Sequence, residues 1–334
     1  MRQTIKRGVK KIISNSSIMG CLGSLRPAGV VVLRYHSILE NPDTLNRLIG
    51  PGIVHSADAF ESHMRLLAKS FTPVTMDDIL SFAAGDTKIP TRAVAVTFDD
   101  GFADNAEVAA PIMDTYKIKG AFYVTTGSIS PQQLPWFFRV RRAFHVTQER
   151  VWTSPLDGTA FGLDDPIQRR QAFLQASRHC AVQNLSDQHT WINILEEQLA
   201  IEKTDSDLSH MMTADQIRKL YNNGHIVGSH TVSHPNVAHI QEKDVCIEIE
   251  TSKNVLEKIV DNPIVHFSYP SPILQPHYNI TTTDILKQFG YKTAVTCTHG
   301  VFSQADNPLL CKRIVVPESS EDLKWAIESV LVTQ

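Results

Sequence analysis

Short apolar runs alternate with amphipathic segments along most of this 334-residue chain. The runs are rich in Val, Ile, Phe and Tyr, which is typical of buried strands. The segments between them carry apolar residues at helical spacing, and several follow a Ser or Thr that can cap a helix. This alternation predicts parallel strands in one sheet with helices packed outside it. The predicted strands are 29–36, 94–98, 120–124, 291–297 and 309–316, and the predicted helices are 56–70, 75–82, 104–116, 213–224 and 241–260.

The alternation fails between about residues 128 and 212. Aromatic and arginine residues crowd the first part of this stretch, and helical segments follow them. We interpret the stretch as a large helical insert in one strand-to-helix connection. Its side chains could stack on sugar rings and contact anionic groups, or the insert could be a helical cap with its own small core. The crowded residues are Trp136, Phe137, Phe138, Arg139, Arg141, Arg142, Phe144 and Trp152.

Two adjacent carboxylates, Asp99 and Asp100, follow one of the apolar runs and precede Gly101. Adjacent carboxylates at the end of a strand repel each other and gain nothing from packing, so they suggest a cation site, a proton-transfer role or both. The alternative is a polar turn in which the glycine takes a positive φ angle. The similar pair at 77–78 follows Thr75 at the start of a predicted helix, where acidic residues are typical.

His230 and His234 provide a second group of polar side chains far downstream. In a helical turn, residues at this spacing face the same side, so the two imidazoles could share one metal ion. Two histidines and one aspartate form a suitable ligand set for a borderline divalent ion such as zinc, with positions left for water and substrate. Histidines also cap helices and form hydrogen bonds in protein cores, so this pair alone is weak evidence for a metal.

The two groups together resemble the motifs of the polysaccharide deacetylases, the family that shares the NodB homology domain. The first motif of the family, Thr-Phe-Asp-Asp-Gly, matches residues 97–101, and the second, His-Ser/Thr-x-x-His, matches residues 230–234. The resemblance extends over roughly residues 29–317, apart from the insert. It implies an α/β fold for residues 28–334, a distorted, TIM-like (β/α) barrel that we expect to have seven strands.

The resemblance also implies the principal site residues and a mechanism. It makes Asp99 the general base of a metal-assisted amide hydrolysis. The divalent metal, with Zn²⁺ as the first candidate, would be bound by Asp100, His230 and His234. In this chemistry the metal polarises the N-acyl carbonyl while the base removes a proton from the attacking water.

Partial matches to the family suggest further site residues. His36 ends the first predicted strand, as a Tyr-His or Phe-His pair does in many members, and we expect it to be the general acid; His299 is the alternative. The third family motif is altered, because Ser268 replaces the arginine that commonly holds the base. The backbone N–H of Ser271 would match the oxyanion donor of the family. Arg313 is the candidate to orient the base instead, with an ordinary surface salt bridge as the alternative.

Composition and charge exclude several classes of protein. Hydrophobic residues make up 42% of the chain and charged residues 20%, which predicts a soluble globular protein with one large core. A net charge of −3 indicates no general affinity for nucleic acid. The five cysteines are scattered and lack Cys-x-x-Cys spacing, as expected of ordinary thiols in a reducing compartment. They are Cys21, Cys180, Cys246, Cys297 and Cys311.

Residues 1–27 form a separate basic segment with an amphipathic pattern. Basic residues surround one apolar helical face, which suits an anionic membrane surface; a terminal helix docked on its own domain is the alternative. The polar stretch 14–17 interrupts the apolar core that an export signal requires. We therefore expect a cytoplasmic protein with peripheral contact at the inner membrane face. The apolar face consists of Ile5, Val9, Ile12 and Ile13.

These patterns predict the removal of an N-acyl group, with N-acetyl as the first candidate, from an amino sugar in a glycan or glycan precursor. Two alternatives stay open. The basic N-terminal segment favours a lipid-linked amino sugar that loses a formyl or acetyl group. The altered third motif and the lack of the family's late Leu-x-His motif favour a catalytically silent carbohydrate-binding protein. The complete first and second motifs oppose the silent protein, because a binding module needs no metal ligands beside a spare base.

Overall fold

The computed structural model describes residues 28–40, 53–129, 134–202 and 210–332. The basic segment 1–27, on which we based the predicted membrane contact, lies outside the described residues, as does Cys21. The cytoplasmic location therefore stays a prediction. Within the described ranges, no helix is both long enough and apolar enough to cross a lipid bilayer. The remaining cysteines, Cys180, Cys246, Cys297 and Cys311, are free thiols.

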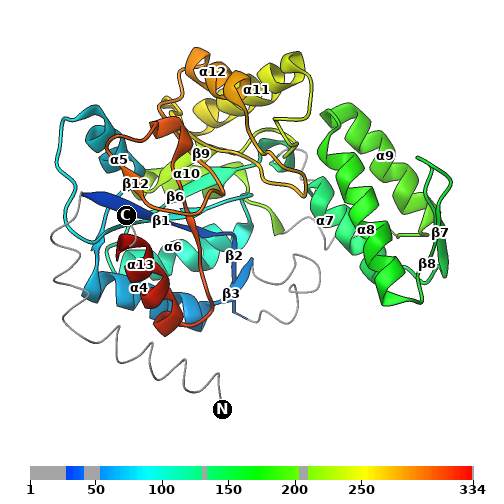
Figure 1. Ribbon diagram of the computed structural model, residues 1–334, viewed down its shortest axis with the longest axis horizontal. Coiled ribbons are helices and arrows are strands. Elements are labelled where there is room, and N and C mark those ends of the chain that lie inside the picture. The colour runs from blue at the N-terminus through cyan, green and yellow to red at the C-terminus, as the bar shows by residue number, and fades with distance from the viewer. Residues whose placement is uncertain (1–27, 41–52, 130–133, 203–209, 333–334) are drawn as a thin grey trace.

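A central β-sheet organises the fold (Figure 1). Its strands are β1 (Gly29–Tyr35), β4 (Thr72–Pro73), β5 (Ala93–Phe98), β6 (Ala121–Val124), β9 (Ile226–Ser229), β10 (His266–Ser268), β11 (Thr293–Val295), β12 (Phe302–Ser303) and β13 (Ile314–Val315). The main path has seven strands in the order β11-β10-β9-β6-β5-β1-β12, while β4 pairs with β5 and β13 with β1. All of these pairs are parallel except β1 with β12.

The sheet curls into a half-barrel, and the segment that leads to β13 contacts both β11 and β1. An isolated bridge joins Val295 of β11 to Cys311, and three residues later β13 begins and pairs with β1. The predicted distorted (β/α) barrel is therefore confirmed. The predicted strands 291–297 and 309–316 are shorter in the structure than in the prediction, and the pattern missed β12, whose apolar run is too short to recognise.

Helices surround the sheet as the sequence predicts. Those outside the insert are α4 (Ala57–Ser70), α5 (Met76–Ala84), α6 (Ala110–Thr115), α10 (Ala214–Asn222), α11 (Glu242–Val260), α12 (Ile280–Gln288) and α13 (Ser320–Val332), with short helical turns η1 (Asn105–Ala109), η2 (Thr126–Ser128) and η4 (Pro308–Leu310). Thr75 and Thr213 begin α5 and α10 with reciprocal capping hydrogen bonds. The predicted helix 104–116 begins instead as the π-helical turn η1, and Pro111, which has no N–H to donate, lies just after this turn in α6.

Two hydrophobic cores lie on opposite faces of the sheet. Along β1, Val31 and Leu33 belong to a core shared with α4, α6, α11 and α13, whereas Val30 and Val32 belong to a core shared with α5. This alternation follows from the two-residue period of a strand. All four side chains are fully buried, and each contributes roughly 1.5–3 kcal/mol of burial free energy. The sheet is therefore held from both faces, which makes it a rigid support for residues at the strand ends.

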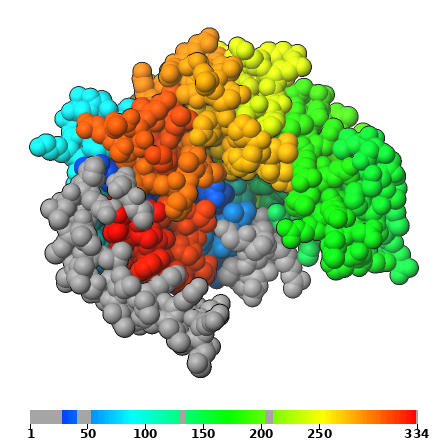
Figure 2. Space-filling view, viewed as in Figure 1, coloured from blue at the N-terminus to red at the C-terminus, as the bar shows by residue number. Residues whose placement is uncertain are grey.

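The insert forms a lobe beside the sheet (Figure 1), and Figure 2 shows it as a green bulge on the body of the molecule. It consists of α7 (Trp136–Val146), β7 (Val151–Thr153), β8 (Ala160–Gly162), α8 (Pro166–Ala181) and α9 (Leu185–Gln198). Buried residues such as Trp136, Phe144 and Trp152 form a separate core within it. The chain leaves the sheet after β6 and returns at the neighbouring strand β9. The predicted helical insert is therefore present, while its exact limits as a domain stay a prediction.

Buried histidines hold the segment between β13 and α13 against β1 and α4. His63 Nδ1 lies 3.1 Å from Tyr35 Oη, and its Nε2 lies 3.1 Å from the carbonyl oxygen of Glu318. His55 Nε2 lies 3.2 Å from the carbonyl oxygen of Val316. Burial lowers the pKa of His63 to about 4, and the charge of His55 lowers it further. The neutral ring of His63 can donate to Glu318 and accept from Tyr35, so protonation would break this arrangement.

We predict that the free energy of unfolding falls as the pH is lowered from 6.5 towards 4. The unfolded chain binds a proton at its ordinary histidine pKa of 6.5, whereas folded His63 stays neutral until about pH 4. For this residue the loss would reach roughly 3 kcal/mol. A His63→Gln variant, which keeps one donor and one acceptor, should show a smaller loss in urea titrations at the two pH values. An equal loss in both proteins would contradict the assignment.

Candidate active site

The predicted site residues converge at the carboxyl ends of the parallel strands. His36 follows β1, Asp99 and Asp100 follow β5, and His230 follows β9. These side chains line a cavity of about 480 Å³, together with His234 and Ser271. The cavity lies between the barrel and the lobe, since Trp136 and Phe137 of α7 and Phe173 of α8 also line it. Polar groups at the carboxyl ends of strands commonly form active sites in such folds.

Asp100, His230 and His234 form a compact cluster of buried metal-ligating groups. Asp100 Oδ1 lies 3.4 Å from the Nε2 atoms of both histidines, and one ligand atom from each residue lies within 4.8 Å of the others. His230 Nδ1 lies 2.7 Å from the carbonyl oxygen of Ser268. This contact fixes the proton on Nδ1, so the lone pair of Nε2 faces the carboxylate.

The arrangement fits a divalent cation. The lone pairs of Asp100 Oδ1 and His230 Nε2 face each other across 3.4 Å, and they repel unless a cation lies between them. His234 Nδ1 is buried without a hydrogen-bond partner among the described residues. No donor to Nδ1 therefore forces the ring proton onto Nε2, and the lone pair of Nε2 can face a cation. Two imidazoles and one carboxylate are typical protein ligands of a catalytic zinc-like ion and leave coordination positions open. The cluster therefore has the chemistry of a metal site.

The predicted helical turn around the two histidines is wrong. Residues 230–234 form a loop in which Thr231 has a φ angle of 67° and His234 one of 57°. Asp100 has a φ angle of 76° in the facing loop. Such left-handed conformations are costly for side chains with a Cβ atom, and above all for a β-branched threonine. These backbone bends, and not helical spacing, turn the two imidazoles towards Asp100.

Hydrogen bonds hold the strained histidine loop in place. Glu248 of α11 is buried and accepts from the backbone N–H groups of Val232 and Ser233, each at 2.8 Å, and from Ser233 Oγ at 2.6 Å. Burial raises the pKa of Glu248, although these hydrogen bonds oppose the shift. On the other side, Gly127 N donates to the carbonyl oxygen of Val232 at 2.8 Å. A Cβ atom at Gly127 would lie 2.6 Å from this oxygen, so the close approach requires glycine.

Asp99 is held by a buried guanidinium. Arg313 Nη1 donates to Asp99 Oδ1 at 2.9 Å and Nη2 to Oδ2 at 2.7 Å, while Ser268 Oγ donates to Oδ1 at 2.9 Å. The side chains of Arg313 and Asp99 are only 1% and 3% exposed, so the alternative of a surface salt bridge is wrong. Burial raises the pKa of Asp99, but the charge and hydrogen bonds of Arg313 together with the nearby histidines outweigh it and keep the pKa well below its usual range. Asp99 is therefore ionised and fixed in orientation.

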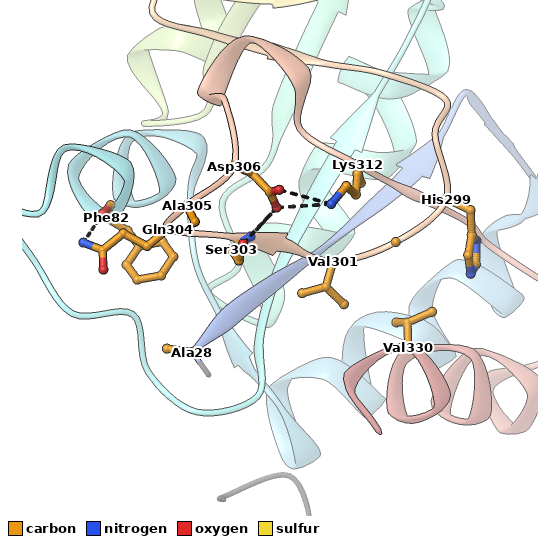
Figure 3. Close-up of a pocket in the computed structure, with 11 residues that line it drawn as sticks. Ala28, Phe82, His299, Val301, Ser303, Gln304, Ala305, Asp306, Lys312 and Val330 are labelled. Carbon is orange, nitrogen blue, oxygen red and sulfur yellow. Dashed lines mark hydrogen bonds and ion pairs between the residues drawn. The ribbon is translucent and has the colours of Figure 1, made fainter. Parts of the chain in front are cut away.

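His36 lies in the cavity, but His299 does not. The carbonyl oxygen of His36 accepts from Asn105 Nδ2 at 2.6 Å, which fixes the backbone after β1. Burial lowers the pKa of His36 to about 4, although the charges of Asp100 and Asp99 oppose the shift. His299 is exposed and lines a different pocket, of about 980 Å³, beside Val330 and Gly300 (Figure 3). The structure therefore favours His36 over His299 as the candidate acid.

The lobe contacts the metal-ligating group directly. Trp136 Nε1 donates to the carbonyl oxygen of His234 at 3.0 Å, and the ring of Phe137 lies 4.8 Å from the imidazole of His234. The insert can therefore be a helical cap with its own core and also present aromatic side chains to a substrate. Trp136 belongs both to the core of the lobe and to the cavity wall. Several cavity residues had no recognisable signal in the sequence. They are Arg34, Ile53, Phe173, Ser177, Pro272, Ile273, Gln275, His277 and Cys297.

Comparisons with known proteins agree with this geometry. A family model described as polysaccharide deacetylase matches residues 86–294, more than half of the chain. Deacetylase PplD from Streptococcus pyogenes, solved in complex with acetate, has a TM-score of 0.60 at 19% identity and covers 90% of this chain and 99% of its own. IcaB from Ammonifex degensii has a TM-score of 0.58 at 18% identity, over 90% and 97%. At these identities the structural likeness shows the fold.

A sequence relative covers a smaller part of the chain. YxkH from Bacillus subtilis (strain 168) is 30% identical over 127 residues, which is 38% of this chain. The match also spans only 38% of the length of YxkH. The activity of the whole relative is therefore no direct guide to the activity of this protein.

We predict that Arg313→Gln destabilises the protein by about 3–5 kcal/mol, because it leaves the buried carboxylate of Asp99 without its counter-charge. The control is Lys312→Gln, which breaks the partly exposed ion pair with Asp306 and should cost about 1 kcal/mol or less. Urea unfolding at pH 7 measures both changes. Equal losses in the two variants would show that the buried pair has no special role.

A second prediction concerns Glu248. We expect Glu248→Gln to weaken divalent-metal binding by roughly 10- to 100-fold, because the amide offers only one acceptor oxygen to the histidine loop. Glu250→Gln, on the exposed face of the same helix, should leave the affinity unchanged. Competition with a chromogenic chelator measures the affinities. If both variants bind metal as the wild type does, the loop does not depend on Glu248.

Proposed function

This chain belongs to the polysaccharide deacetylase family, and we propose that it uses a divalent metal to hydrolyse an N-acyl group, with N-acetyl as the first candidate, on an amino sugar of a glycan or glycan precursor. One observation carries the proposal. The ion-paired carboxylate of Asp99 and the Asp100, His230 and His234 cluster line the same cavity. A fixed base beside a set of metal-ligating groups suits the metal-assisted hydrolysis of an unactivated amide.

Asp99 and its partners would serve the attack of water. A divalent ion bound by Asp100, His230 and His234, with Zn²⁺ as the first candidate, would polarise the acyl carbonyl and acidify a nearby water molecule. Asp99 would accept the proton of this water, and the two hydrogen bonds from Arg313 and the one from Ser268 keep its carboxylate in one orientation. Because its pKa is low, Asp99 would hold this proton only briefly.

Two further groups would act on the developing charges. Ser271 lines the cavity. Its backbone N–H would donate to the acyl carbonyl oxygen of the substrate as negative charge develops on that oxygen. His36 would protonate the departing amine. Its imidazole is neutral at pH 7 because burial lowers the pKa to about 4, so it would take up a proton only as negative charge develops beside it. This proton would be the one that Asp99 removes from the water and then releases. The products would be a carboxylate and an amino sugar that carries a positive charge.

The alternatives differ in their support. The acetate bound to PplD, a protein of similar fold, fits a reaction that releases acetate. A lipid-linked amino sugar stays an alternative substrate, and it rests on the basic segment 1–27. A silent carbohydrate-binding protein has the least support, because binding alone requires neither a buried, triply hydrogen-bonded Asp99 nor a cluster of metal-ligating groups beside it.

We predict that Asp99→Asn lowers kcat for acetate release from N-acetylated oligosaccharides by about 10²- to 10⁴-fold, because the amide cannot accept a proton. The variant should still bind one equivalent of zinc, since Asp99 is no ligand. His234→Gln should instead lose the metal. Measurements of released acetate and bound metal in the same preparations separate the two effects. Full activity of metal-loaded Asp99→Asn would remove this residue as the base.

A further inference from the structure

The three arginines of α7 have different surroundings. Arg139 forms hydrogen bonds with both carboxylate oxygens of Glu196, at 2.8 and 2.6 Å. Arg142 donates to the carbonyl oxygen of Glu202 at 3.0 Å. Arg141 instead lines the cavity, where its guanidinium lies over the ring of Phe173, 4.8 Å from the centroid. Within the described part of the chain, it has no carboxylate partner.

Arg34 is a second cationic side chain in the cavity wall. It lies at the carboxyl end of β1, and its Nη1 donates to Cys297 Sγ at 2.5 Å. Its Nε atom is buried without a hydrogen-bond partner among the described residues. His36 and His277 also line the cavity; burial is the main cause of their lowered pKa, and the positive charge of Arg34 lowers it further. Arg34 therefore faces cavity groups and has no ion pair in the described ranges.

The acidic residues of the cavity wall cannot neutralise these two cations. Among the described residues, the acidic groups that line the cavity are Asp99 and Asp100. Asp99 is already neutralised by Arg313, and Asp100 faces the two metal-ligating histidines. Burial lowers the pKa of Arg141, as expected of a guanidinium that is removed from water without a counter-charge. An anion in the cavity would offset this cost.

We propose that Arg34 and Arg141 bind an anionic group, a phosphate or a carboxylate, on the substrate whose amino sugar is deacylated. This inference rests on the proposed function and specifies its substrate. Guanidinium groups suit the planar, bidentate recognition of such anions. The ring of Phe173 beneath Arg141 restricts the orientation of the guanidinium, and Phe137 adds an aromatic surface suited to a sugar ring. A neutral polymer would leave both cations without a counter-charge.

The test compares an uncharged N-acetylated sugar with two anionic relatives, one with a phosphate at C1 and one with a carboxylate. The proteins are the wild type, Arg34→Gln, Arg141→Gln, and Arg142→Gln as the matched control from the same helix. The first readout is the ratio of kcat/KM for each anionic substrate to that for the neutral one. The second is the binding of inorganic phosphate and of the phosphorylated sugar to metal-stripped protein by calorimetry.

We expect the wild type to prefer one anionic substrate, and that preference identifies the anion. Each cavity variant should lower the ratio by about 10- to 100-fold, the usual value of a charged hydrogen bond. Arg142→Gln should leave the ratio unchanged, and Arg141→Lys, which keeps the positive charge, should lower it less than Arg141→Gln does. Equal use of neutral and anionic sugars by the wild type, or equal effects of all three variants, would overturn the proposal.

The calorimetric arm separates this proposal from the proposed function. If no sugar is deacylated but phosphate binding depends on Arg34 and Arg141, the anion site stands and the deacetylase activity fails. If the neutral sugar is deacylated and the variants leave both the ratio and phosphate binding unchanged, the activity stands and the anion site fails. Loss of thermal stability in Arg34→Gln or Arg141→Gln would be recognised by comparing its melting temperature with that of Arg34→Lys or Arg141→Lys.

Discussion

The buried ion pair between Arg313 and Asp99 is the interaction on which the site depends. Its two charges are removed from water, which is favourable only when every donor and acceptor finds a partner. Here Thr97 and Ser268 hydroxyl groups and the carbonyl oxygen of Thr296 complete the contacts of the guanidinium. These partners come from β5, from β10 and from the end of β11. The pair therefore orients the carboxylate of Asp99, the proposed base, and also connects the last segment of the barrel to its centre.

Backbone strain is concentrated around the candidate metal site of Asp100, His230 and His234. Asp100, Thr231 and His234 all have positive φ angles, and each is held by neighbours that are themselves buried. Buried Glu248 accepts hydrogen bonds from two backbone N–H groups of the histidine loop, and on the opposite side of the loop Gly127 N donates to the carbonyl oxygen of Val232. This support offsets a local cost of about 1–3 kcal/mol for each strained residue. The fold itself thus holds Asp100, His230 and His234 in the arrangement that the proposed metal site requires.

The sequence predicted those parts of the site that depend on local patterns. Asp99 and Asp100 could be placed because an apolar run ends directly before them, and the capping residues Thr75 and Thr213 located two helices. The loop around His230 was wrongly predicted as a helical turn, because left-handed φ angles at non-glycine residues leave no pattern. Ser268 was predicted only as a replacement for arginine, although it and Arg313 both contact Asp99. Such contacts depend on strand register and barrel curvature, which no short motif records.

The lobe connects the proposed anion site to the candidate metal site. One helix, α7, contributes Arg141 to the cavity wall and, through Trp136, a hydrogen bond to the backbone of His234. The same Trp136 is packed in the core of the lobe, so the position of α7 is set by contacts outside the cavity. A ligand that binds Arg141, as we propose, would therefore act on the same helix that contacts the backbone of His234. Because packed cores resist small displacements, binding at Arg141 and the position of His234 should be coupled through α7.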